Sequence, residues 1–179
     1  MKKLLIVIAL VAILATGTAF ADHPDGFGIG LVGSYGWGGG GGGLSLKIPS
    51  IPIYWGVFFW GYEDNFSLGV TGDYYLLDDQ IVSILHWYLG LGGFFNFNNH
   101  TRHWANKDYS YSSFYLGARI PIGLSLQPIP LLEVFLDVAP SFGVHIRSSQ
   151  KADDGHEFQK GGAGFAWGWP IEVGLRLWF

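Results

Sequence analysis

The chain has 179 residues, of which 49% are hydrophobic and only 13% are charged, against an average of about 25% charged in soluble domains. It contains 10 Lys and Arg, 14 Asp and Glu and no cysteine. This composition excludes disulfides and thiolate metal sites and argues against nucleic acid as a partner. Beyond the N-terminal segment no apolar run reaches about 20 residues, which excludes a transmembrane helix. The 28 glycines and 17% aromatic residues favour a membrane β-barrel over a large soluble β core.

The N-terminal segment, residues 1–21, has the pattern of a bacterial secretory signal peptide, which is removed from the mature protein. Lys2 and Lys3 precede an apolar run over residues 4–15, and Ala19-Phe20-Ala21 forms a small-x-small cleavage site. Cleavage after Ala21 would leave residues 22–179 as a single domain of 158 residues. Because the two lysines leave with the signal, eight basic residues would face 14 acidic ones, a net charge of −6.

Alternating apolar and polar residues in the rest of the chain predict about eight β-strands. The strands are expected at residues 26–35, 44–48, 53–61, 66–74, 82–97, 114–122, 132–139 and 169–179. Short connections are expected at residues 38–43, 49–52, 63–65, 78–80 and 127–130, and long polar loops at 98–110 and 147–162. An even number of strands joined by alternating short and long connections is typical of outer-membrane barrels.

The C-terminal strand shows the alternation most clearly. Its odd positions from Trp169 to Phe179 are all apolar, whereas its even positions include Glu172, Gly174 and Arg176. A bare apolar strand face at the edge of a soluble sheet invites aggregation. A strand that closes a barrel in a bilayer has a reason for this pattern, since one face meets lipid and the other the lumen.

With these features the chain resembles small eight-stranded outer-membrane barrels of the OmpX and OmpW kind, including spirochaete outer-membrane barrels of similar length. The resemblance rests on Ala19-Phe20-Ala21, the eight-strand plan and the terminal Leu175-Arg176-Leu177-Trp178-Phe179. It implies an all-β fold, namely an eight-stranded antiparallel up-and-down transmembrane β-barrel in the bacterial outer membrane, with short periplasmic turns and longer external loops. It also implies that the barrel-assembly machinery reads the C-terminal residues as an assembly signal: Leu175, Leu177, Trp178 and Phe179.

If the apolar strand faces meet lipid, most charged strand residues must face the lumen. This set is expected to form a lumen charge network: Lys47, Asp73, Arg119, Glu133, Asp137, Glu172 and Arg176. Counting from the periplasmic turns predicts a lower tier of Lys47, Asp73, Glu133 and Arg176. The same count predicts an upper tier of Arg119, Asp137 and Glu172, with His86 near it. Buried charges need partners, and an eight-stranded interior is just wide enough to be filled by side chains, so a salt-bridged, filled lumen is expected.

No catalytic constellation, metal site or cofactor site is predicted from the sequence. We therefore expect a non-enzymatic monomeric barrel that contacts outer-membrane lipid and presents its long loops to host or environmental partners. The OmpW resemblance implies an alternative, a narrow channel or binding barrel for small hydrophobic molecules. Its inward candidates are Tyr54, Phe58, Tyr88, Phe94, Tyr115 and Phe135. An embedded lipid-modifying enzyme stays open as a third reading.

Overall fold

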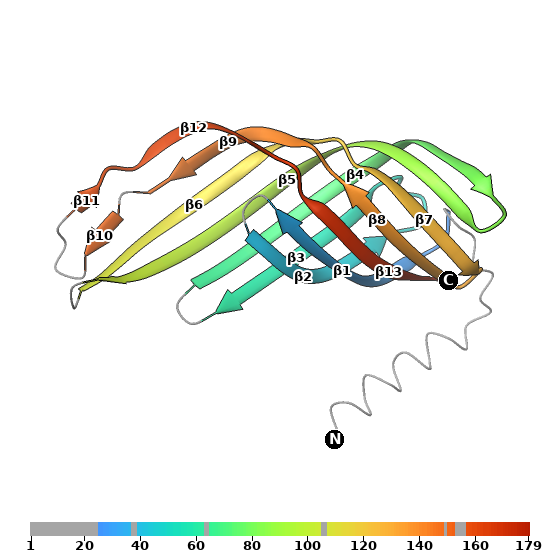
Figure 1. The fold of residues 1–179 in the computed structure, drawn as a ribbon, viewed down its shortest axis with the longest axis horizontal. Coiled ribbons are helices and arrows are strands. Elements are labelled where there is room, and N and C mark those ends of the chain that lie inside the picture. The colour runs from blue at the N-terminus through green and yellow to red at the C-terminus, as the bar shows by residue number, and fades with distance from the viewer. Residues whose placement is uncertain (1–24, 37–38, 63–64, 105–106, 149, 153–156) are drawn as a thin grey trace, which may run out of the picture.

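The computed structural model describes residues 25–36, 39–62, 65–104, 107–148, 150–152 and 157–179. The predicted signal peptide lies outside these residues. The described chain folds into strands that close into an eight-stranded antiparallel barrel, as predicted (Figure 1). The strands are β1 (Gly28–Gly36), β2 (Gly39–Lys47), β3 (Tyr54–Tyr62), β4 (Asn65–Val82), β5 (Leu85–Trp104), β6 (Lys107–Arg119), β7 (Ile122–Ile129), β8 (Leu132–Val138), β9 (Ser141–Arg147), β10 (Gln150–Ala152), β11 (Glu157–Gln159), β12 (Gly162–Gly168) and β13 (Ile171–Trp178).

The thirteen segments make eight barrel strands because prolines interrupt three of the strands and the short segments β10 and β11 follow β9 and precede β12. β6 continues into β7 across Pro121, β8 into β9 across Pro140, and β12 into β13 across Pro170. Proline has no N–H to give to a ladder. The three breaks lie side by side, since Ile120 N–H donates to Pro140 O and Ala139 N–H donates to Pro170 O. Three neighbouring strands therefore bend together at one level of the barrel wall.

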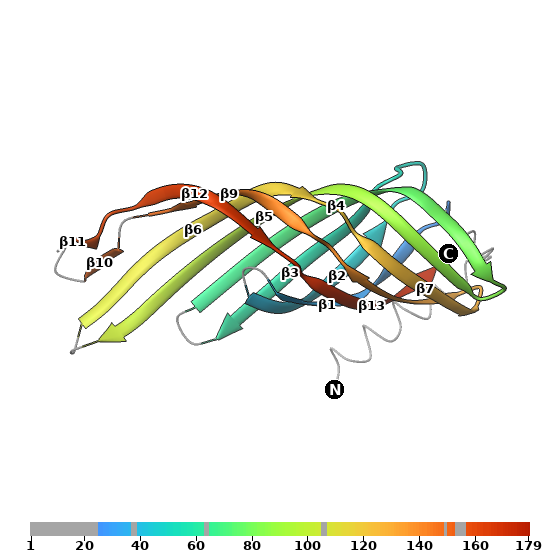
Figure 2. The same cartoon turned by 45° about the horizontal axis from the view of Figure 1, so that its top comes forward.

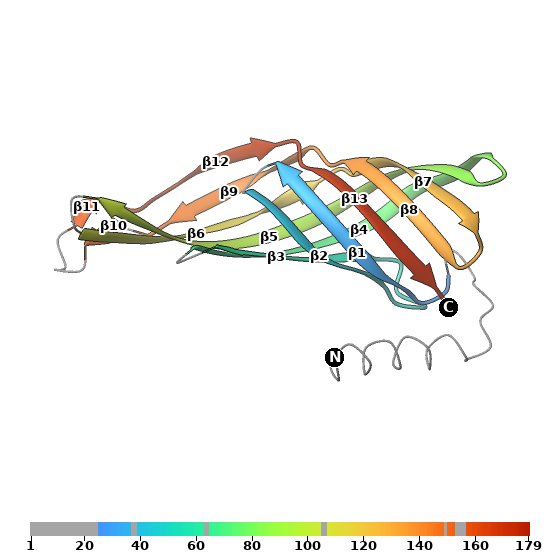
Figure 3. The same cartoon turned by 60° about the horizontal axis from the view of Figure 1, so that its bottom comes forward.

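The barrel closes between its first and last strands, β1 and β13, which lie next to each other in Figure 3. Their antiparallel pairing runs from Gly28 opposite Trp178 to Tyr35 opposite Ile171. It extends to the last residue, because Phe27 and Phe179 exchange two backbone hydrogen bonds of 2.9 and 2.8 Å. Closure leaves the barrel wall without a free edge in this region, as a structure in lipid requires.

The outward face of the barrel is apolar on every side. Leu31 on β1, Leu116 on β6 and Val173 on β13 expose 59%, 59% and 55% of their surface. In water such a continuous apolar belt would be an aggregation surface, whereas in a bilayer it meets acyl chains. Among the described residues there is no helix of the length and hydrophobicity that crossing a membrane demands.

The glycine run at 38–43 is not a connection, as the sequence suggested. From Gly39 onward it belongs to β2, which pairs with β1 and with β3. The reason is close backbone approach: a Cβ on Gly43 would lie 2.0 Å from the carbonyl oxygen of Val57. Glycine here allows two strands of a small barrel to approach each other closely. From composition alone, the same run of glycines suggests a turn.

Several predicted connections are strand instead. The turn expected at 78–80 is wrong, because β4 runs on to Val82 and pairs with β5 up to Leu85. The turn expected at 127–130 begins only after Ile129, because β7 ends at that residue. Most of the loop expected at 98–110 is the paired end of β5 and β6, which extends beyond the β3–β4 hairpin in Figure 2. The loop expected at 147–162 contains β10 and β11, and its residues 149 and 153–156 lie outside the described chain.

We expect the lumen-facing and lipid-facing glycines of β5 to differ sharply in their tolerance of a side chain. A Cβ on Gly92 would lie 1.9 Å from Asp73 Oδ1 and 2.6 Å from Gly72 O, whereas on the neighbouring Gly93 the nearest atom is 3.6 Å away. Gly92→Ala should lower the free energy of unfolding by about 1–3 kcal/mol. Gly93→Ala should change it by less than about 0.5 kcal/mol. Urea unfolding in lipid vesicles measures both, and equal midpoints would contradict the assigned facing of β5.

Candidate functional site

The lumen holds all seven charged residues that the strand alternation pointed inward. None exposes more than 6% of its surface: Lys47, Asp73, Arg119, Glu133, Asp137, Glu172 and Arg176. Their strands are β2, β4, β6, β8 and β13, so the charges come from around the barrel wall. They gather about two arginines, and we name the groups the Arg176 cluster and the Arg119 cluster.

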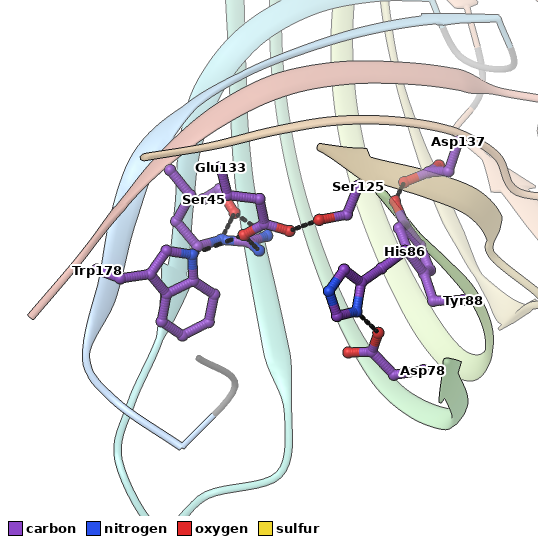
Figure 4. Close-up of polar contacts among 9 residues, drawn as sticks. Ser45, Asp78, His86, Tyr88, Ser125, Glu133, Asp137 and Trp178 are labelled. Carbon is purple, nitrogen blue, oxygen red and sulfur yellow. Dashed lines mark hydrogen bonds and ion pairs between the residues drawn. The ribbon is translucent and has the colours of Figure 1, made fainter. Parts of the chain in front are cut away.

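The Arg176 cluster joins β13 to β8 and β2 near the end of the barrel where the chain terminates (Figure 4). Arg176 Nη1 donates to Glu133 Oε2 at 2.6 Å. Its Nε and Nη2 both donate to Ser45 Oγ, at 3.1 and 2.8 Å. Glu133 also accepts from the Ser125 hydroxyl at 2.9 Å and from Trp178 Nε1 at 2.8 Å. The buried carboxylate and guanidinium therefore have several partners each, which offsets their loss of water.

Aromatic rings surround the guanidinium of Arg176. Its central carbon lies 4.9 Å from the ring centroid of Tyr54 and 4.7 Å from that of Phe135. Lys47 reaches the same region, with Nζ 5.6 Å from the Tyr54 centroid and 3.3 Å from Ile48 O. Ring faces attract cations, so these contacts further stabilise charge inside the barrel.

The Arg119 cluster lies on the other side of the Tyr54 region and draws residues from four strands. Arg119 Nη1 donates to Glu172 Oε1 at 2.8 Å, and Arg119 Nε lies 3.2 Å from Asp73 Oδ1. Arg119 Nη2 lies 3.9 Å from Asp137 Oδ1, and the Tyr88 hydroxyl donates to Asp137 Oδ2 at 2.8 Å. One guanidinium thus links β6 to β13, β4 and β8 across the lumen.

The structure corrects two tier assignments. Asp73 belongs with Arg119, not with the lower residues, and His86 lies 3.6 Å from Asp78 at the β4–β5 end rather than near Arg119. The misplaced turn is one cause, because the true end of the β4–β5 hairpin lies further from Asp73. Strand tilt is the other, since the register places Asp73 opposite Gly92 and Gly92 opposite Arg119. Because the strands are tilted, residues that pair across neighbouring strands lie at different heights along the barrel axis. A count along one strand misses this offset.

A stack of three tyrosines fills the lumen between the clusters. Tyr75 lies between Tyr54 and Tyr88, with ring centroids 4.0 and 4.3 Å apart and planes within 10°. Tyr54 and Tyr88 are among the inward aromatics expected from the sequence, whereas Tyr75, Ser45 and Ser125 are inward residues that were not predicted. Tyr75 lies two residues after Asp73, so strand parity would have found it.

The C-terminal residues occupy different surroundings. Trp178 is fully buried and bonded to Glu133, whereas Leu175 faces outward with 43% exposed. Leu177 lies opposite Ile29 in the closing ladder, and Phe179 pairs with Phe27. These contacts show the part that the four residues play in closure, and their recognition by an assembly machinery stays a prediction.

Little space remains in the lumen. A cup of about 60 Å³ lies against Arg119 and Glu172, and a cavity of about 20 Å³ lies between the two clusters beside Tyr75. Pockets for small apolar ligands are typically about 300–1,000 Å³. No group of His, Asp and Glu arranged to hold a metal ion occurs among the described side chains.

Comparison with solved structures shows a related architecture. A major outer membrane protein from Thermus thermophilus superimposes with a TM-score of 0.54 at 16% identity, covering 86% of this chain and 98% of that one. This chain has the fold of an outer-membrane β-barrel. Neisserial surface protein A aligns with a TM-score of 0.38 at 15% identity, over 86% of this barrel and 97% of its own chain. No family model matches the barrel, and no curated protein matches it.

We expect Arg176→Met to lower the free energy of unfolding by about 3–5 kcal/mol, because it leaves the Glu133 carboxylate buried without its cation. Lys160→Met, at an exposed position, should change it by less than about 0.5 kcal/mol. Removing both partners in Arg176→Met with Glu133→Met should cost less than the sum of the two single changes. Urea unfolding in vesicles, followed by tryptophan fluorescence, tests this, and equal midpoints for Arg176→Met and Lys160→Met would contradict it.

Proposed function

We propose that this protein is a closed, non-enzymatic barrel of the bacterial outer membrane that stabilises the membrane and presents its extended strands to partners outside. One observation carries the proposal: two arginine-centred clusters occupy the lumen, and Arg119 links β4 to β13 on opposite walls. Arg119 joins β6 to β4, β8 and β13, and Arg176 joins β13 to β8 and β2. With the tyrosine stack between them, they leave no wide aqueous path.

The outward surface supports the membrane location. Aliphatic and aromatic side chains alternate with the lumen charges on the same strands, as on β13, where exposed Val173 lies between buried Glu172 and the inward Gly174. Strands of about 9–11 residues span a bilayer, and β1, β2 and β3 have nine residues each. Entry through a cleaved signal peptide, recognition by the assembly machinery and a monomeric state are parts of the same proposal.

The uneven height of the wall supports a role in external contacts. β4 last pairs with β5 at Phe66 and Asn99, whereas β5 and β6 remain paired out to Trp104 and Lys107. β10 and β11 add to this high side, so four segments extend beyond the low rim formed by the β1–β2 and β3–β4 hairpins (Figure 1). Paired strands hold a surface more rigidly than loops would, and that suits recognition of a partner.

The alternative of a barrel for small hydrophobic molecules gains no specific support. Tyr54 and Tyr88 belong to the stack, and Phe135 contacts the Arg176 guanidinium. Phe58 and Phe94 line the 60 Å³ cup, and Tyr115 stacks on His145. The six inward aromatics therefore fill space against their neighbours instead of lining a common apolar cavity.

The test is conductance in planar bilayers. The wild-type barrel should give no steady single-channel steps. A variant with Arg119→Ser, Glu172→Ser, Arg176→Ser and Glu133→Ser removes the ion pairs of both clusters and should conduct, because the lumen then holds water where the long side chains were. Heat-modifiable migration on a detergent gel verifies that this variant is folded.

A partial variant controls for loosening of the barrel. Arg119→Ser with Glu172→Ser alone should stay closed, since the Arg176 cluster and the tyrosine stack still fill the lumen. Steady steps from the wild type, of the size given by the four-residue variant, would show an open pore and remove the closed-barrel proposal.

A further inference from the structure

The 60 Å³ cup against the Arg119 cluster lies toward the end of the barrel where the β1–β2 and β3–β4 hairpins turn. Its floor is the ion pair of Arg119 and Glu172, and its wall includes Phe58 from β3 and Phe94 from β5. Gly41 lies at its side on β2. In the orientation proposed above, this is the external end, so the cup opens away from the cell.

Small polar side chains surround this aromatic wall. Ser34, Thr71 and Asn96 line the cup. On the floor, Arg119 Nη1 donates to Glu172 Oε1, whereas Arg119 Nε and Nη2 are fully buried and face Asp73 and Asp137. The cup is therefore lined by hydroxyl and amide groups, by aromatic residues and by a floor of paired charges.

Above the cup, β5, β6 and β9 carry further aromatic and polar side chains. Those on β6 lie on the same face of the strand as Arg119. Tyr115 stacks on His145 with ring centroids 5.7 Å apart. Tyr111 lies 5.4 Å from the His100 ring and 5.3 Å from the Arg147 guanidinium carbon. We call these five residues the polar ledge. On its other edge β5 last pairs with β4 at Asn99 and Phe66, and Asn65 then contacts His100 and Thr101, so β5 is paired with β6 alone beyond this point.

We propose that the cup binds the terminal sugar ring of an external glycan, whose following residues run along the polar ledge. A sugar presents C–H groups on its faces and hydroxyls around its rim, which match aromatic rings and short polar side chains respectively. About 60 Å³ equals the space of several water molecules, enough for the leading edge of one ring but not for a whole oligosaccharide. This inference rests on the proposed function for the direction in which the cup opens.

Other ligand classes fit the cup less well. An acyl chain would leave the guanidinium, carboxylate and amide facing hydrocarbon, at a cost of several kcal/mol. An inorganic anion would meet Glu172 on the floor, and the three carboxylates around Arg119 outnumber its single positive charge. A neutral polyhydroxyl compound satisfies donors and acceptors together and adds no charge.

Saturation-transfer difference NMR on the folded barrel in a zwitterionic detergent tests the proposal. Glycoside and maltoside detergents are excluded because their headgroups would compete. The probes are the methyl glycosides of glucose, galactose and N-acetylglucosamine, followed by rough lipopolysaccharide and its lipid A portion, which separate a free glycan from a membrane-anchored one. We expect saturable transfer from the protein to at least one methyl glycoside, and to the sugars of lipopolysaccharide if the source is a lipid-linked chain.

Two variants and a matched control assign the binding to the cup. Asn96→Leu keeps the branched shape and the number of side-chain heavy atoms while it removes the amide, and should weaken binding by about tenfold. Gly41→Phe places a ring in the cup, since a Cβ there meets Phe59 O at 3.3 Å and Trp60 Cβ at 3.6 Å, and should abolish binding. Gln80→Leu removes an exposed amide at the opposite end of the barrel and should leave binding within about twofold of wild type.

The inference is overturned by any of three results. These are no transfer to any glycoside, unchanged binding by folded Gly41→Phe, or transfer to lipid A acyl chains without transfer to sugars. Failure here is distinct from failure of the proposed function. A non-conducting barrel that binds no sugar overturns only the cup, whereas a conducting wild type overturns the closed barrel whatever the sugar result.

Discussion

Charge inside a ring of hydrogen-bonded strands is the constraint on which this barrel depends. Lipid on the outside forces charged residues of the membrane-spanning strands inward, and a lumen of this width gives those residues no bulk water. They persist only as paired groups, so Arg119 pairs with carboxylates from β4, β8 and β13, and Arg176 pairs with Glu133 on the neighbouring β8. The same contacts that satisfy the charges also hold the walls together and fill the passage, which links the stability of the barrel to its closure.

The glycines and prolines of the wall follow from that crowded interior. Gly92 leaves room for the meeting of Asp73 and Arg119, and Gly43 lets β2 approach β3. Pro121, Pro140 and Pro170 break three adjacent strands at one level, near the Arg119 cluster at the end of β6 and the start of β13. Small residues and interruptions thus allow a narrow barrel to curve around its bulky contents.

The two ends of the barrel differ in what fills the lumen. Near the chain terminus, Trp178 and Glu133 seal the lumen with an indole and a saturated set of hydrogen bonds. Toward the other end, the cup is lined by hydroxyl and amide side chains above a floor of paired charges, and the wall rises on one side only. The lumen is therefore densely filled near the chain terminus and holds a small polar cup toward the other end.

The sequence by itself determined the all-β class, the strand faces and the identity of the seven inward charges, because period-2 alternation is strong wherever one face meets lipid and the other does not. It failed where that contrast disappears: beyond the apolar belt, where β5 and β6 remain strands among polar residues, and in the glycine run, where β2 lacks side chains to alternate. Only the tertiary structure decided the pairing of Asp73 with Arg119, the place of Tyr75 in the stack and the shape of the cup. Partners across a barrel are set by strand tilt and register, which depend on all eight strands at once and leave no trace within any single one.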